Sequence, residues 1–133
     1  MSILLIEDSE GDIFLVRRAL EKHGLKHDVI VARDGEQALR MLHQAEKGPA
    51  ADVPQIVLLD LNLPKVGGSQ ILSHIRRTQA LAAMPVIVLT SSDSPADRDS
   101  MVALGANVYF RKSTDLQSFM ELGQVVKQLL ATR

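Results

Sequence analysis

The sequence predicts an α/β fold in which one parallel five-stranded sheet carries helices on both faces. Five short runs rich in Ile, Val and Leu recur along the chain, and segments with helical spacing of apolar residues lie between them. The runs are mostly uninterrupted, which is typical of strands that are covered on both sides. Five consecutive βα units close into a parallel sheet by right-handed crossovers. The expected strands are residues 3–6, 29–32, 56–59, 86–89 and 108–110.

The first three helices follow from apolar spacing and from end signals. Residues 12–23 place apolar side chains on one face, and Gly24 ends that helix. Asp34 is expected to cap the second helix, because Gln37 lies at the capping-box distance. Residues 68–78 place their Ile and Leu side chains on one side. Each of these helices therefore has one face to bury against the sheet.

The last two helices carry clearer start signals. Ser94 and Pro95 form an N-cap followed by proline at the first helical position, and Gly105 closes the helix. Thr114 and Gln117 have the capping-box spacing, so we expect Thr114 to cap one final helix.

Composition limits the classes of function. The 133 residues suit one compact domain, so we expect a single domain over residues 1–133. A net charge of −1 without a basic block argues against nucleic acid and membrane-surface partners. No segment resembles a membrane span or a secretory signal, so a soluble cytoplasmic protein is expected. The absence of cysteine excludes disulfides and thiolate sites.

The four histidines are scattered along the chain and lack the spacing of a zinc site. We therefore expect them to be surface or helix-end residues. They are His23, His27, His43 and His74.

Polar residues follow the expected strands at their carboxyl ends, where ligands bind in open α/β sheets. Glu7 and Asp8 follow the first strand, Asp60 the third, Thr90 the fourth and Lys112 the fifth. Close carboxylates repel one another unless a cation is supplied, and hard oxygen ligands suit Mg²⁺. A hydroxyl and an ammonium beside the metal would complete a phosphoryl site. Taken singly, most of these residues also fit a solvated strand end, a turn or the surface, but Asp60 lies between two apolar stretches and is harder to dismiss.

The chain resembles the receiver domain of bacterial two-component response regulators, of which the chemotaxis response regulator is an example. The resemblance implies a flavodoxin-like (βα)₅ fold with strand order 2-1-3-4-5. The DLNLPK motif and the long loop before the third strand also resemble the phytochrome-associated subgroup. The matching stretches, in order along the chain, are LLIEDSEGD, VARDGEQAL, IVLLDLNLPKVGG, VIVLTSSDS and LGANVYFRK.

The resemblance implies a role for each acidic strand-end residue. Asp60 would be the phosphoacceptor, a carboxylate nucleophile that forms an acyl phosphate. Glu7 and Asp8 would hold Mg²⁺ together with Asp60, and Asn62 would add its backbone carbonyl. Pro64, with the glycines at 67 and 68, would shape the loop that follows Asp60.

The resemblance also implies a switch. Lys112 would pair with Asp60 at rest and with a phosphoryl oxygen afterwards, and Thr90 would donate its hydroxyl to the phosphoryl group. Tyr109 would turn inward as Thr90 moves, which changes the surface of helix four, strand five and helix five. The family has proline after the switch lysine, usually with a cis bond, where this chain has Ser113. A cis bond before a residue other than proline costs about 2.5–4 kcal/mol, so we expect trans.

The leading hypothesis is a phosphoacceptor switch in a phosphorelay, phosphorylated by a sensor histidine kinase or phosphotransfer protein and acting on a downstream protein not identified by the sequence. Self-phosphorylation and slow autodephosphorylation would be its only chemistry, and the resemblance allows a homodimer. Two alternatives stay open. One is a Mg²⁺-dependent phosphohydrolase of the haloacid-dehalogenase type, which needs a second acid where this chain has Asn62. The other is a degenerate receiver that binds partners without phosphorylation.

Overall fold

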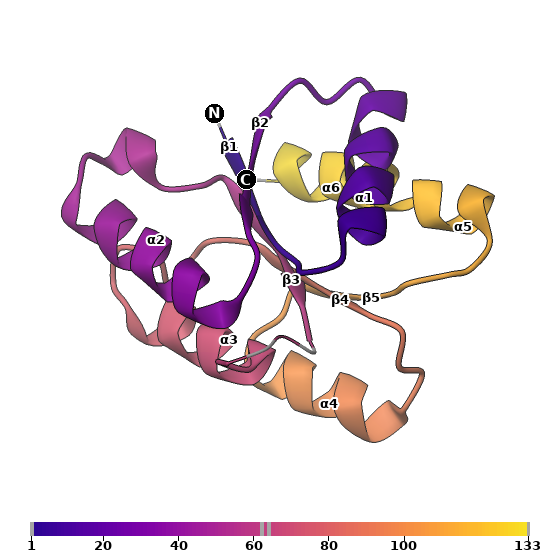
Figure 1. Cartoon of the computed structure of the whole chain (residues 1–133). Helices are drawn as coiled ribbons and strands as arrows, with labels where there is room; N and C mark the ends of the chain where they lie inside the picture. The colour runs from indigo at the N-terminus through magenta and orange to yellow at the C-terminus, as the bar shows by residue number, and fades with distance from the viewer. Residues whose placement is uncertain (1, 62, 64, 133) are drawn as a thin grey trace.

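The structure is a computed structural model, and it describes residues 2–61, 63 and 65–132. Helices and strands alternate along the chain in the predicted manner (Figure 1). The strands are β1 (Ser2–Ile6), β2 (Asp28–Ala32), β3 (Ile56–Asp60), β4 (Val86–Thr90) and β5 (Val108–Arg111). The α-helices are α1 (Glu10–Lys22), α2 (Gly35–Lys47), α3 (Gly68–Arg77), α4 (Pro95–Ala103), α5 (Leu116–Met120) and α6 (Leu122–Ala131), and a 3₁₀ turn, η1 (Ala50–Asp52), lies in the long loop before β3.

The strands form one parallel sheet in the order β2-β1-β3-β4-β5, which confirms the predicted fold class and strand order. β3 lies at the centre between β1 and β4, and every residue of β3 is buried. Asp60 is the last residue of β3 and pairs in register with Leu89 of β4. The carboxyl ends of the strands therefore meet along one edge of the sheet.

Helices cover both faces of the sheet, and each face has its own apolar core (Figure 1). One core joins the sheet to α2, α3 and α4, with Leu42, Leu72 and Met101 among its buried side chains. The other joins the sheet to α1, α5 and α6, with Val16 and Phe119 among its members. Two separate cores explain why the strands are apolar on both sides.

The end of the chain differs from the prediction. The single final helix is divided into α5 and α6 at Glu121. Its expected N-cap, Thr114, is wrong: Asp115 holds that position and accepts a hydrogen bond from the Gln117 backbone N–H at 3.1 Å. The cap moves by one residue because a carboxylate and a hydroxyl are both good acceptors at a helix start.

Two glycines let the loops around the end of β3 approach closely. A Cβ on Gly68 would lie 2.9 Å from the Asp60 carbonyl oxygen, and a Cβ on Gly35 would lie 2.1 Å from the Val66 carbonyl oxygen. The start of α3 can therefore pack directly on the backbone that carries Asp60. The expected role of Pro64 in this loop lies outside the described residues.

In the part of the chain that the structure describes, no helix has the length and apolar character needed to cross a bilayer.

Candidate functional site at the carboxyl ends of the strands

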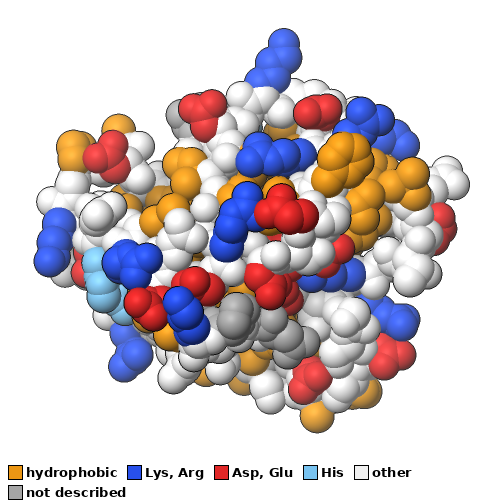
Figure 2. Space-filling model, in the orientation of Figure 1, with side chains coloured by type: hydrophobic (Ala, Val, Ile, Leu, Met, Phe, Trp, Pro, Cys, Tyr) orange, Lys and Arg blue, Asp and Glu red, His pale blue; other side chains and the backbone are white. Residues whose placement is uncertain are grey.

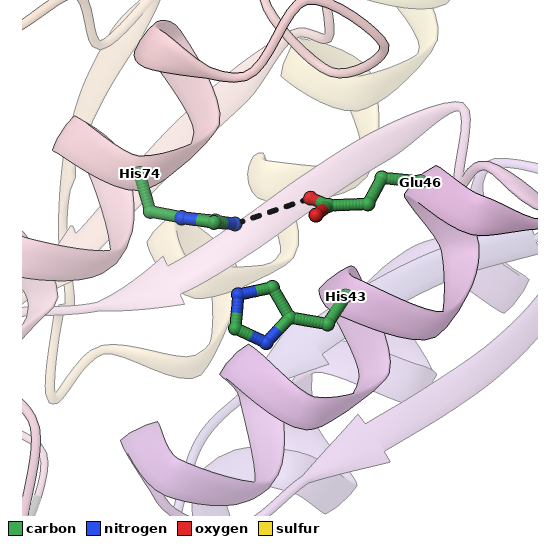
Figure 3. A group of neighbouring side chains, drawn as sticks. All are labelled: His43, Glu46 and His74. Atoms are coloured by element: carbon green, nitrogen blue, oxygen red, sulfur yellow. Dashed lines mark ion pairs between the residues drawn. The ribbon is translucent and has the colours of Figure 1, made fainter.

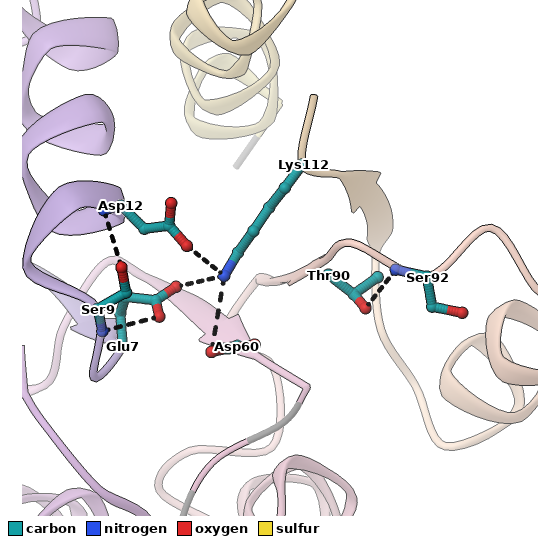
Figure 4. A network of polar contacts seen from close by, with 7 residues as sticks. All are labelled: Glu7, Ser9, Asp12, Asp60, Thr90, Ser92 and Lys112. Atoms are coloured by element: carbon teal, nitrogen blue, oxygen red, sulfur yellow. Dashed lines mark hydrogen bonds and ion pairs between the residues drawn. The ribbon is translucent and has the colours of Figure 1, made fainter. Parts of the chain in front are cut away.

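Four elements deliver the polar side chains of the site. Asp60 and Thr90 are the last residues of β3 and β4, while Glu7 and Lys112 follow directly after β1 and β5. Backbone hydrogen bonds continue the sheet just past the strand ends, from Glu7 N–H to the Ala32 carbonyl at 2.9 Å and from Lys112 N–H to the Thr90 carbonyl at 2.6 Å. The sheet thus fixes the backbone from which these side chains project (Figure 4).

Lys112 is the cation at the centre of the cluster. Its Nζ donates to Glu7 Oε2 at 2.7 Å and to Asp12 Oδ2 at 2.8 Å, and it lies 3.6 Å from Asp60 Oδ2 (Figure 4). Burial alone would lower the pKa of Lys112. The hydrogen bonds that Lys112 donates to Asp12 and Glu7, together with the charges of Glu7 and Asp60, outweigh burial and raise the pKa to about 12. Lys112 is therefore charged throughout the physiological range.

Glu7 is fully buried, and its environment disfavours the ionised form. Burial raises the pKa of Glu7 to about 7; Lys112 opposes this rise and the neighbouring Asp60 adds to it. Glu7 Oε1 also accepts a hydrogen bond from the Ser9 backbone N–H at 3.2 Å. A buried acid beside a second acid gains from a further cation.

The acidic residues form a group that is suited to a divalent cation. One carboxylate oxygen from each of Glu7, Asp8 and Asp60 lies within 4.8 Å of the other two. Asp60 and Glu7 are buried, whereas Asp8 is exposed and open to water. Carboxylate oxygens beside solvent match the preference of Mg²⁺, which keeps several waters. The backbone carbonyl of Asn62, expected as a further ligand, lies outside the described residues.

Thr90 and Tyr109 meet at the Ser92 backbone. Thr90 is fully buried, and its hydroxyl accepts a hydrogen bond from the Ser92 N–H at 3.1 Å. Tyr109 is half-buried, and its hydroxyl donates to the Ser92 carbonyl at 3.4 Å. Ser92 in turn donates its own hydroxyl to Asp97 of α4 at 2.7 Å. A movement of Thr90 would therefore reach both β5 and α4 through one residue.

The peptide bond between Lys112 and Ser113 is trans, as predicted from the absence of proline. The Ser113 hydroxyl accepts a hydrogen bond from the Asp115 N–H at 3.0 Å, just before α5 begins. Lys112 nevertheless reaches the other strand ends, so the change at residue 113 leaves it in the cluster.

Sequence reasoning missed two contributors to this site. Asp12 holds Lys112 across 100 residues of sequence, yet an acid in the first turn of a helix is usually explained by the helix dipole. Ser9 is the actual N-cap of α1, accepting from the Asp12 N–H at 3.3 Å. Asp12 lies on the α1 turn that directly follows Glu7 and Asp8, and this position was the sequence signal that could have placed it near the site.

Charged side chains gather around the centre of the face shown in Figure 2, over the loops that follow β1 and β2 in Figure 1. Within this surface the site combines a buried carboxylate at the end of β3, an acidic group for a cation, an ammonium and a buried hydroxyl. This combination provides a nucleophile and the groups that neutralise a phosphoryl oxyanion.

Comparison with known proteins gives a consistent result. Residues 3–123 match the family described as the response regulator receiver domain. The chain is 36% identical to response regulator Rcp1 of Synechocystis sp. over 125 residues, which covers 94% of this chain and 85% of Rcp1.

Solved structures agree with the sequence match. The crystal structure of the Mn²⁺-bound form of Rcp1 superposes with a TM-score of 0.83 over 96% of this chain and 91% of that chain. The phosphorylated cyanobacterial phytochrome response regulator RcpA is 33% identical, with a TM-score of 0.84 over 98% of this chain and 93% of that chain. The expected resemblance to the phytochrome-associated subgroup is therefore confirmed.

Proposed function

Because the chain belongs to the response regulator receiver family and is a phosphoacceptor signalling domain, we propose that Asp60 is the residue that accepts the phosphoryl group. The observation that carries the proposal is the position of Asp60 at the end of β3, buried, 3.6 Å from Lys112 and grouped with Glu7 and Asp8. Glu7 is also buried beside Lys112 and the exposed Asp8, but burial raises the pKa of Glu7 to about 7, which makes its carboxylate a poorer candidate for a nucleophile at neutral pH.

In the proposed reaction an Asp60 oxygen attacks phosphorus. The bond from phosphorus to the donor histidine nitrogen breaks, the nitrogen keeps the electron pair, and an acyl phosphate forms on Asp60. Glu7, Asp8 and Asp60 would hold Mg²⁺, which would neutralise charge on the phosphoryl oxygens when bound. Asn62 would add its backbone carbonyl to the same ion.

Lys112 and Thr90 complete the proposed site. Lys112 exchanges part of its present contact with Glu7 and Asp12 for a phosphoryl oxygen, because the phosphoryl group carries more charge than a carboxylate. Thr90 turns its hydroxyl towards the same group and gives up its contact with the Ser92 N–H. Contacts with Glu7, Asp12 and Asp60 keep Lys112 charged and close to the acceptor carboxylate before phosphorylation.

The proposed output is a change on the surface formed by α4, β5, α5 and α6. Movement of Thr90 alters the Ser92 backbone, to which the Tyr109 hydroxyl is bonded, and Tyr109 then turns inward. Ser92 also contacts Asp97, so α4 is displaced by the same event. Phosphorylation would thereby shift the equilibrium between two conformations that the domain already adopts.

Receiver domains of response regulators interact with histidine kinases and with downstream targets, and they act as signalling proteins and not as conventional enzymes. For this chain we propose a sensor histidine kinase or a phosphotransfer protein as the donor, with self-phosphorylation and slow autodephosphorylation as its only chemistry. A homodimer, a cytoplasmic location and a single domain over residues 1–133 stay predictions. A size measurement with and without beryllofluoride tests the dimer.

One experiment tests the phosphoacceptor. The protein is incubated with Mg²⁺ and acetyl phosphate, and intact mass is measured for wild type, Asp60→Asn and Asp52→Asn, which alters an exposed acid in η1. Wild type and Asp52→Asn should gain one phosphoryl group, and Asp60→Asn should gain none. A phosphoryl adduct on Asp60→Asn would mean that another residue is the acceptor and would contradict the proposal.

The same experiment separates the two alternative functions. Absence of an adduct in wild type, together with no response to beryllofluoride, would favour a degenerate receiver. Rapid phosphate release from many phosphate esters would favour a phosphohydrolase.

A further inference from the structure

A second group of metal-ligating side chains lies away from the strand ends, between α2 and α3. His43 and Glu46 are three residues apart on α2 and so share one face of the helix, and His74 comes from α3 (Figure 3). One ligand atom from each of the three lies within 4.8 Å of the other two. Both residues fit the expected surface or helix-end positions, since His43 is exposed and His74 lies in the last turn of α3, yet their ring centroids are only 4.8 Å apart.

We propose that His43, Glu46 and His74 form a binding site for a borderline transition-metal cation, with Zn²⁺ as the principal candidate. Two imidazole nitrogens and one carboxylate oxygen are the ligand types that Zn²⁺ uses when a fourth position stays open to water. Mg²⁺ takes oxygen ligands instead. The two proposed sites of this protein therefore differ in the class of ion that each selects.

The carboxylate of Glu46 gives independent support. Its Oε2 atom is buried and receives no hydrogen bond from the described residues, although it lies 3.3 Å from His74 Nε2. A buried carboxylate oxygen without a donor is unfavourable. A cation between Glu46 and the two imidazoles would satisfy that oxygen directly.

The backbone is already arranged for this site. Leu42 precedes His43 and Ile75 follows His74, and both apolar side chains are fully buried in the same core. The two helices are thus fixed against the sheet, and only side-chain rotation is required. Ligand atoms around a tetrahedral Zn²⁺ lie about 3.4 Å apart, so no pair of these ligand atoms, all within 4.8 Å of one another, has to close by more than about 1.4 Å. His43 is exposed and free to turn by that amount.

The surroundings allow an ion to enter. His43 and His74 line an open hollow of about 1000 Å³ at the surface, and histidine surface is visible in Figure 2 on the side where α2 lies. Arg76 also lines the hollow, but its guanidinium donates to the Gly105 carbonyl at 2.7 Å and to the Met84 carbonyl at 2.6 Å. Its charge is therefore engaged elsewhere. The Thr78 hydroxyl donates to the His74 carbonyl at 2.7 Å and steadies the end of α3.

The test is a calorimetric titration of the metal-free protein with ZnCl₂ in excess Mg²⁺, which occupies the acidic site. We expect one Zn²⁺ per chain and a rise in melting temperature. His43→Ala and His74→Ala should each weaken binding by about tenfold or more, because removal of even a supporting partner of a metal ligand has that effect. His43→Ala is the cleaner variant, since an exposed side chain is removed without disturbing the core.

Two control variants and a spectrum complete the design. His27→Gln removes a histidine just before β2, and Asp8→Asn alters the acidic site; both variants should bind Zn²⁺ as wild type does. Co²⁺ should give the intense visible absorption of tetrahedral coordination in wild type and lose it in His43→Ala. The proposal is overturned if Zn²⁺ does not bind, if it binds His43→Ala with wild-type affinity, or if Asp8→Asn abolishes binding.

Discussion

Replacing Glu7 by Gln should stabilise the protein at pH 8 when no divalent cation is present. Glu7 is fully buried beside Asp60, and its pKa is raised from 4.5 to about 7. Each pH unit between the two pKa values corresponds to about 1.4 kcal/mol, so ionised Glu7 costs about 3 kcal/mol of folding free energy relative to its protonated form. Gln avoids that cost but gives Lys112 a weaker acceptor. We expect a net gain of about 1–2 kcal/mol.

The dependence on pH has a definite sign. Because the pKa of Glu7 is higher in the folded protein, the folded state binds more protons between the two pKa values. The stabilising contribution of protonated Glu7 is complete below pH 4.5, and it is lost as the pH rises through about 7. Wild type should lose this contribution over that interval, whereas Glu7→Gln should not. The advantage of the variant should therefore shrink towards pH 5.

Addition of Mg²⁺ should reverse the order. A cation that binds only the folded state stabilises it by an amount that grows with the logarithm of the ratio of its concentration to its Kd, and Glu7 is one of three proposed ligands. Wild type should gain stability from millimolar Mg²⁺, and Glu7→Gln should gain much less. Binding of Mg²⁺, which offsets the cost of the buried Glu7 charge, should therefore increase the free energy of unfolding of wild type.

Urea unfolding followed by far-ultraviolet circular dichroism is the suitable assay, because the chain has no tryptophan and a single tyrosine. Curves at pH 5 and pH 8, in EDTA and in Mg²⁺, give the four free energies. Glu21→Gln, which changes an exposed acid on α1, should stay within about 0.5 kcal/mol of wild type throughout. If Glu7→Gln is less stable than wild type at pH 8 in EDTA, burial of the Glu7 charge is not the dominant effect and the reasoning fails.

Three further substitutions test the structure. Gly123→Ala should destabilise by about 2–3 kcal/mol, because its Cβ would lie 2.2 Å from the main chain of α1; a thermal melt measures this. Arg76→Met should cost about 2–3 kcal/mol in a urea titration, because it leaves carbonyl oxygens such as that of Gly105 without a donor. Lys112→Met should cost about 3–5 kcal/mol at pH 8, because Glu7 loses its buried counterion, and lowering the pH or adding Mg²⁺ should restore part of the loss.

Each of these substitutions has a matched control. Gly11→Ala places a Cβ on α1 where the nearest atom is 3.9 Å away, so it should be neutral or stabilising. Arg77→Met removes the exposed neighbour of Arg76 and should have little effect. Lys22→Met changes an exposed lysine in the last turn of α1. Equal losses in a substitution and its control would refute the specific contact in question.

The fold was predictable because its strongest signals are local. A run such as 56–59 is apolar on both faces, and only a central strand between two helical layers buries both. Once parallel order was assigned, Asp60, Thr90 and Lys112 had to meet at one edge, since carboxyl ends of parallel strands share it. The break at Glu121 was not predictable, because the apolar spacing continues across it.

Contacts between helices on one face of the sheet carry no such signal. His43 and His74 meet only because α2 and α3 are neighbours, and their side chains face each other through the rotation of each helix about its axis. Sequence spacing gives that rotation to within tens of degrees, which is too coarse to place two rings 4.8 Å apart. The contact between Asp12 and Lys112 was missed for a different reason, because an acid in the first turn of α1 is already explained by the helix dipole.

The contact between Asp12 and Lys112 changes what the absence of proline at residue 113 implies. In this chain the position of Lys112 is set by carboxylates on three different elements, so a trans bond to Ser113 does not release it. Asp12 and Glu7 hold the ammonium closer than Asp60 does, at 2.8 and 2.7 Å against 3.6 Å. Phosphorylation must therefore draw Lys112 away from two acids. Since a cation at Glu7 weakens one of those contacts, metal binding and release of Lys112 should favour each other.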